Sequence, residues 1–209
     1  MMDDGAFWRL MEAIASGNRA VVLDLLTASP ALAKATLREG AARATSTGNF
    51  LTEIKHSVYT GDTALHVAAA AHRPEIARRL ISLGADVRAR NRRGATPLHY
   101  AADGIPGSPR WNPDAQTATV AFLIGSGADP NATDQNGVPP LHRAVRTRCA
   151  AAVNALLNGG AEAGRKNGNG STPMMLATRQ TGRGGSGSPE AKMQQAEIIR
   201  LLERDGMTP

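Results

Sequence analysis

Cysteine and aromatic residues are scarce in this chain of 209 residues. The single cysteine, Cys149, excludes an internal disulfide bond and fits a reducing compartment, and no neighbouring residue completes a Cys–His nucleophile pair. Aromatic residues make up 3% of the chain, whereas alanine and leucine supply much of its apolar content. This composition favours closely packed helices over a β-sandwich.

Long hydrophobic runs are also missing. No window is apolar over the length that a membrane span needs. The first ten residues, MMDDGAFWRL, have no basic region followed by an apolar stretch, so we expect no secretory signal. We therefore expect a cytoplasmic location, and a signal-independent export route stays open.

Lysine is the third scarcity, with 4 lysines against 20 arginines in a chain of net charge +6. The positive excess lies late in the chain, because residues 143–183 carry seven basic and one acidic residue. Two interpretations stay open. The bias reflects either a genome that prefers arginine codons or a surface that meets an anionic partner.

An internal repeat dominates what the sequence does contain. Four tetrapeptides recur at spacings of 33, 43 and 33 residues: TALH at 63–66, TPLH at 96–99, PPLH at 139–142 and TPMM at 172–175. A second motif recurs downstream of the first three: GADVRARN at 84–91, GADPNATD at 127–134 and GAEAGRKN at 160–167.

These motifs resemble the ankyrin repeat, whose period is 33 residues, over about residues 58–206. The resemblance implies an all-α solenoid in which each unit is a hairpin-like loop followed by two antiparallel helices. The expected units are 58–90, 91–133, 134–166 and a C-terminal capping repeat at 167–209 with a Gly/Ser-rich insertion.

Individual residues suit these positions. Threonine before three of the first helices can cap them, and proline suits their first turn. Glycine after each second helix suits a backbone of positive φ. The threonines are Thr63, Thr96 and Thr172, the prolines Pro97, Pro140 and Pro173, and the glycines Gly84, Gly127 and Gly160.

The first 57 residues lack the tetrapeptide. Residues 1–30 have apolar residues on one face of each of two helices and are expected to form an N-terminal cap pair. Residues 31–57 are an insert that we expect to pack on the array, with a helix near 31–44. Phe50, Leu51 and Ile54 are apolar enough to fold back.

A glycine-rich stretch at 182–187, GRGGSG, matches the dinucleotide pattern G-x-G-x-x-G. That pattern requires a preceding β-strand in a parallel sheet, and here a helix of the last unit precedes it. We therefore interpret the stretch as a loop insertion. The second unit carries an insertion at the same joint between its helices, residues 103–116.

Equivalent joints of a solenoid align along one edge, and here that edge is basic. Free N–H groups of helix starts, such as the one expected near Ser188, favour anions. The alternative is a pair of solvated loops. The candidate residues of this loop edge are Arg110, Trp111, Arg148, Arg183 and Ser188, with Arg146 nearby.

Histidine recurs once per unit at His66, His99 and His142. In ankyrin repeats this histidine holds neighbouring loops together, and histidines one repeat apart are too distant to share a zinc ion. The chain contains no H-E-x-x-H, G-x-S-x-G or P-loop motif. We therefore expect no metal, no cofactor and no catalysis.

The resemblance implies a protein-binding module that reads its partner with loop tips and first-helix ends on the concave face. The many arginines among these positions predict a salt-sensitive contact with an acidic protein surface, and we expect the protein to be a monomer. Nucleic acid at residues 143–183 and a small anion or phosphometabolite at the loop edge are the alternatives. The expected contact residues are Tyr59, Asp62, Arg92, Arg93, Asp103, Gln135, Asn136, Arg146, Asn169 and Arg179.

Overall fold

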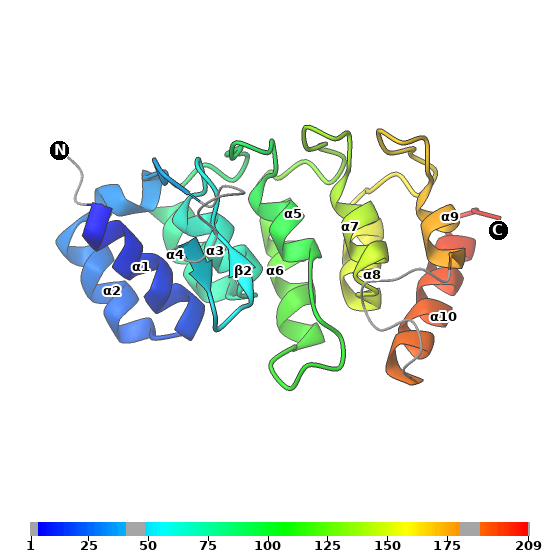
Figure 1. Cartoon of the computed structure of the whole chain (residues 1–209), viewed down its shortest axis with the longest axis horizontal. Helices are drawn as coiled ribbons and strands as arrows, with labels where there is room; N and C mark the ends of the chain where they lie inside the picture. The colour runs from blue at the N-terminus through cyan, green and yellow to red at the C-terminus, as the bar shows by residue number, and fades with distance from the viewer. Residues whose placement is uncertain (1–3, 41–48, 180–188, 209) are drawn as a thin grey trace.

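The computed structural model describes residues 4–40, 49–179 and 189–208. Within these residues the helices form five consecutive antiparallel pairs that stand side by side in a row (Figure 1). The pairs are α1 (Asp4–Ser16) with α2 (Arg19–Ala28), α3 (Ala64–Ala70) with α4 (Pro74–Ser82), α5 (Pro97–Ala102) with α6 (Pro113–Gly125), α7 (Pro140–Arg146) with α8 (Ala150–Asn158), and α9 (Pro173–Thr178) with α10 (Pro189–Arg204).

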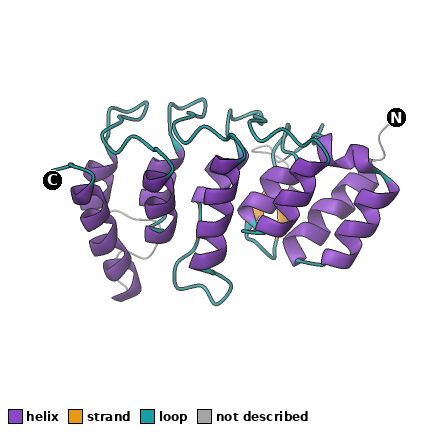
Figure 2. Cartoon of the chain, turned by 180° about the vertical axis from the view of Figure 1, so that it is seen from behind, coloured by secondary structure: helices purple, strands orange, loops and turns teal. Residues whose placement is uncertain are grey.

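The helices lie in two layers. The first helices pack on one another in the order α1, α3, α5, α7 and α9, and the second helices α4, α6, α8 and α10 do the same. Loops between successive pairs gather along one edge of the row, and the long loop between α5 and α6 projects from the opposite edge (Figures 1 and 2). The predicted all-α solenoid is confirmed.

The tetrapeptide produces the start of each first helix. The Thr63 hydroxyl accepts a hydrogen bond from the backbone N of His66 at 3.3 Å, and His66 Nδ1 accepts one from the backbone N of Thr63 at 3.2 Å. Thr96 and His99 form the same capping box. These reciprocal bonds satisfy two backbone donors that a helix start leaves free.

The close approach of neighbouring units depends on small side chains. Ala68 and Ala69 of α3 and Ala101 and Ala102 of α5 are completely buried, so these two first helices pack closely. Glycines of positive φ follow α4, α6 and α8, as expected: 89° at Gly84, 98° at Gly127 and 90° at Gly160. The predicted boundaries of the units, 58–90, 91–133, 134–166 and 167–209, remain a prediction.

The insert differs from its prediction. A 3-10 helix, η1 (Pro30–Lys34), packs against α2, α3 and α4, and the chain then extends, with Thr36 paired to Thr63. The expected helix near 31–44 is therefore wrong over residues 35–40, because their backbone bonds the loop before α3: Leu37 N donates to Asp62 O at 2.8 Å. Residues 41–44 of that prediction lie outside the described residues.

A short hairpin follows, with β1 (Phe50–Leu51) antiparallel to β2 (His56–Ser57). Leu51 is buried and Ile54 packs against the core, as expected, but Phe50 is 43% exposed. The His56 ring lies edge-on to Tyr100 of α5, with ring centroids 4.3 Å apart. The hairpin therefore reaches the second full unit.

Candidate interaction surface

The hairpin tips before α5, α7 and α9 are built alike. Asn91, Asp134 and Asn167 each accept two backbone N–H bonds with one side-chain oxygen, at 2.9–3.1 Å from residues two and four positions on. This side-chain-to-backbone turn fixes the hairpin without help from the helices. The tips therefore present their side chains from a rigid backbone.

Neighbouring tips are joined by backbone hydrogen bonds. Arg92 N donates to Thr60 O at 2.8 Å, Gln135 N donates to Arg93 O at 2.9 Å, and Gly168 N donates to Gly137 O at 3.1 Å. Because one bond joins each tip to the next, the loops form a continuous edge along the array (Figure 2).

The tip residues expected at the surface lie there. Arg92, Arg93, Gln135, Asn136 and Asn169 are exposed. Tyr59 is half-buried, and the Arg93 guanidinium lies over its ring, 4.9 Å from the centroid. This cation–π contact holds Arg93 above the tip.

Asp62 does not lie at the surface. It is 0% exposed, and its carboxylate accepts bonds from the Tyr59 backbone N at 2.7 Å, from Asn91 Nδ2 at 2.8 Å and from the Tyr100 hydroxyl at 3.1 Å. Burial, and then the Asp62 charge, raise the pKa of Tyr100 above its usual value, so the phenol keeps the proton it donates. We therefore remove Asp62 from the contact set.

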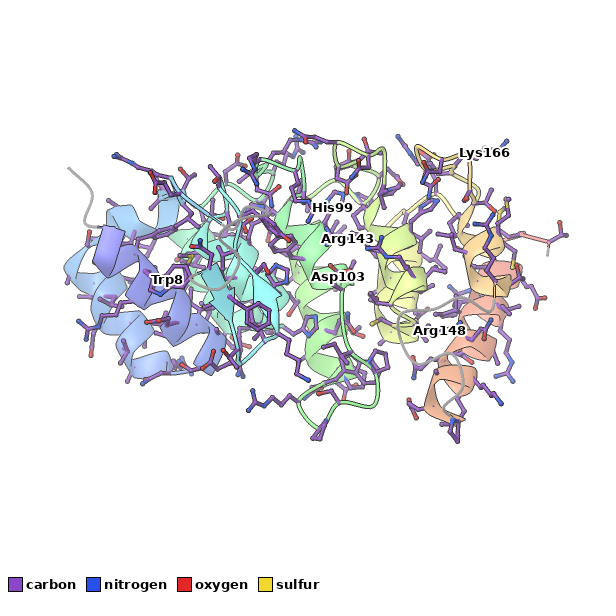
Figure 3. All side chains as sticks on the ribbon, viewed as in Figure 1. Trp8, His99, Asp103, Arg143, Arg148 and Lys166 are labelled. Atoms are coloured by element: carbon purple, nitrogen blue, oxygen red, sulfur yellow. The ribbon has the colours of Figure 1, made fainter. Side chains whose placement is uncertain are left out.

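Asp103 is also engaged inside the array. Arg143 of α7 donates to both of its carboxylate oxygens, Nε to Oδ1 at 3.3 Å and Nη2 to Oδ2, and the two side chains face each other in Figure 3. The Arg143 guanidinium also lies 5.5 Å from the centroid of Tyr100. Sequence reasoning missed Arg143. Its place in the repeat, one residue after His142, puts its side chain against the preceding unit, where it meets Asp103.

The arginines at helix ends divide into two kinds. Arg146, at the end of α7, and Arg179, just after α9, are exposed. Arg148, between α7 and α8, is only 5% exposed and does not form part of an open loop edge.

The rest of the expected loop edge is only partly described. Arg110 is exposed and donates to the backbone O of Glu53 at 2.9 Å, so it ties the α5–α6 loop to the insert. Trp111 is half-buried and donates from Nε1 to Gln116 at 2.9 Å. Arg183 and Ser188 lie outside the described residues.

The repeated histidines join one unit to the next, as the resemblance implies. Nε2 of His66 bonds Ala95 O at 3.1 Å, that of His99 bonds Val138 O at 3.0 Å, and that of His142 bonds Ser171 O at 2.9 Å. Burial lowers the pKa of all three, and that of His99 to about 4. These histidines are therefore neutral structural bridges at neutral pH.

Cys149 is completely buried at the start of α8. Burial raises the pKa of its thiol to about 11, which makes the thiolate scarce at neutral pH. Over the described ranges, no three His, Cys, Asp or Glu side chains are grouped so that they could hold a metal ion. None of the helices described is both long and apolar enough to cross a bilayer.

Comparison with known proteins agrees with this architecture. The family model for ankyrin repeats, in three copies, matches residues 10–108 and 113–205. A stretch of 46 residues is 52% identical to neurogenic locus notch homolog protein 4 of Homo sapiens. That match covers 22% of this chain and 2% of the Notch protein, so the similarity concerns a small part of its length.

Proposed function

Because this chain belongs to the ankyrin-repeat family, we propose that it is a non-catalytic binding module that holds a partner protein on one face of the array. Ankyrin repeats are generally protein–protein interaction modules. The proposed face consists of the hairpin tips and the exposed ends of the first helices, the concave face of the family. The observation that carries the proposal is the row of exposed polar tip residues on hydrogen-bonded, rigid loops.

The charge of this face supports an acidic partner. Arg92, Arg93, Arg146 and Arg179 are exposed there. The Asp103 carboxylate is paired with Arg143. The face therefore carries less unpaired negative charge than the sequence suggests. Association of a basic face with an acidic surface gains speed and specificity from this complementarity and weakens as salt screens the charges.

The proposal places the protein in the cytoplasm as a monomer. A reducing compartment suits the free, buried thiol of Cys149, which has no second cysteine to pair with.

A pull-down from lysate of the source organism tests the function. Wild-type protein is compared with Arg92→Glu/Arg93→Glu/Arg146→Glu, and nuclease is added to half of the samples. The matched control reverses three exposed arginines on second helices, Arg19→Glu/Arg79→Glu/Arg200→Glu.

The proposal predicts one protein that wild type and control retain, that the first variant loses and that nuclease does not affect. Recovery that vanishes with nuclease would instead assign the basic segment 143–183 to nucleic acid, because phosphate contacts supply most of such binding. Equal recovery by both triple variants would exclude the proposed face.

A further inference from the structure

Three arginines surround a small pocket at the C-terminal end of the array. The pocket has a volume of about 130 Å³ and lies between the ends of α7 and α9 and the side of α10. Arg146, Arg148 and Arg179 line it together with apolar side chains and Gln195. None of the described residues that line it carries a carboxylate. Figure 3 places Arg148 at this end of the array.

The equivalent joint of an earlier unit shows what is unusual about Arg148. His72 stands six residues after His66, as Arg148 stands six residues after His142, and both have left-handed backbones, with φ of 50° and 58°. His72 Nε2 bonds the backbone O of Asp103 at 3.1 Å. Arg148, by contrast, makes no side-chain hydrogen bond or ion pair with any described residue, although it is only 5% exposed.

The two joints also differ in charge balance. Asp103 and Arg179 occupy the same position, seven residues after Thr96 and Thr172. Asp103 is neutralised by Arg143, whereas Arg179 faces a pocket that already contains two other arginines. Like charges gathered at one joint repel one another, and the described residues that line this pocket supply no counter-charge.

We propose that this pocket binds a phosphoryl group, either as the free ion or at the end of a larger molecule. Guanidinium groups match phosphate oxygens with paired N–H donors, and a dianion offsets more of the three positive charges than a carboxylate does. The apolar wall from Val145, Leu176 and Ile198 lowers the local dielectric and strengthens the attraction. The pocket is far below the ~300 Å³ or more of a drug-sized site, so it receives the phosphoryl group alone.

The pocket shares Arg146 and Arg179 with the proposed protein-binding face. Its test uses the purified protein without a partner, so the two proposals fail separately. Isothermal titration calorimetry with inorganic phosphate is performed at fixed ionic strength, with chloride as the competing anion. The variants are Arg148→Gln, Arg146→Gln/Arg179→Gln and the control Arg9→Gln, which removes an exposed arginine of α1. Circular dichroism establishes that each variant is folded.

The proposal predicts saturable phosphate binding by wild type and Arg9→Gln, and an affinity at least about tenfold lower in both pocket variants, since each variant loses charge-assisted hydrogen bonds to the anion. O-phosphoserine, a phosphate monoester, distinguishes the two sources of the group: tighter binding than phosphate indicates a larger ligand, and equal binding indicates the free ion. Unchanged affinity in the double variant, whose buried Arg148 is intact, would overturn the proposal. So would binding of acetate as tight as that of phosphate, or no binding at all.

Discussion

Asp103 and Arg143 are 40 residues apart in the chain and form a two-point ion pair between α5 and α7. Their side chains are 26% and 15% exposed, so solvent screens the pair only in part. We predict that Asp103→Ala lowers the free energy of unfolding by about 1–2 kcal/mol, because the bonds are charge-assisted but not fully buried. Urea unfolding measures the loss.

Glu203→Ala is the control for this substitution, since Glu203 is exposed on α10. A double-mutant cycle with Arg143→Ala is expected to give a coupling energy of about 1 kcal/mol. Purely additive losses would show that the two residues act independently.

The buried carboxylate of Asp62 gives a second prediction. Asp62→Ala leaves Asn91, the Tyr100 hydroxyl and the Tyr59 backbone N without their acceptor, so we expect a loss of about 3 kcal/mol in the free energy of unfolding. Asp24→Ala, at an exposed position of α2, is expected to change little. Because Asp62 is completely buried, the folded variant should bind the partner with unchanged affinity. Loss of affinity in a folded variant would return Asp62 to the contact set.

Two tip glycines make a matched pair for a third prediction. Gly137 and Gly170 both have positive φ, 67° and 75°. A Cβ on Gly137 would lie 2.9 Å from Gly168, whereas one on Gly170 would meet open space. We expect Gly170→Ala to lower the free energy of unfolding by about 1 kcal/mol, from backbone strain alone. Gly137→Ala should cost more, because Gly168 in the adjacent tip must also shift. Thermal unfolding compares the two variants. Equal losses of stability would show that the contact between the tips at Gly137 and Gly168 tolerates the extra atom.

The His99 bridge makes stability depend on pH. Burial lowers the pKa of His99 from 6.5 to about 4, so between these values the unfolded chain binds more protons than the folded one. The contribution of neutral His99 is therefore complete above pH 6.5 and declines on acidification, by up to about 1.4 kcal/mol per pH unit.

Urea unfolding at several values between about pH 7.5 and 5 measures this slope. We predict a shallower slope in His99→Gln, although that variant is less stable at pH 7.5 because it loses the bond to Val138. Identical slopes in the two proteins would show that His99 does not titrate as stated.

Much of the array could be predicted from the sequence, because the repeat places the same chemistry at the same position each time. Threonine, proline and histidine that recur at spacings of 33 and 43 residues imply the helix starts and the bridges from His66, His99 and His142. The insert has no such counterpart. Its path follows from backbone bonds between Leu37 and the loop before α3, and backbone groups carry no sequence signal.

The candidate surface was harder to predict because exposure depends on the neighbouring unit. Asp62 lies at the end of a loop that its own unit does not cover. Asn91 and Tyr100 of the next unit cover it and bond its carboxylate. Arg148 is likewise buried at a joint that looks open in sequence. The tip residues Arg93, Gln135 and Asn136 were easier, since a hairpin tip has no further unit above it.

Site-specific photocrosslinking tests the central claim most directly. A benzoylphenylalanine replaces Gln135, an exposed tip residue, or Ala121, an exposed residue of the second helix α6. The account predicts that in lysate the probe at 135 crosslinks one defined protein, that Arg93→Glu in the adjacent tip reduces its yield, and that the probe at 121 does not capture it. Capture of the same protein from 121 but not from 135 would contradict the account.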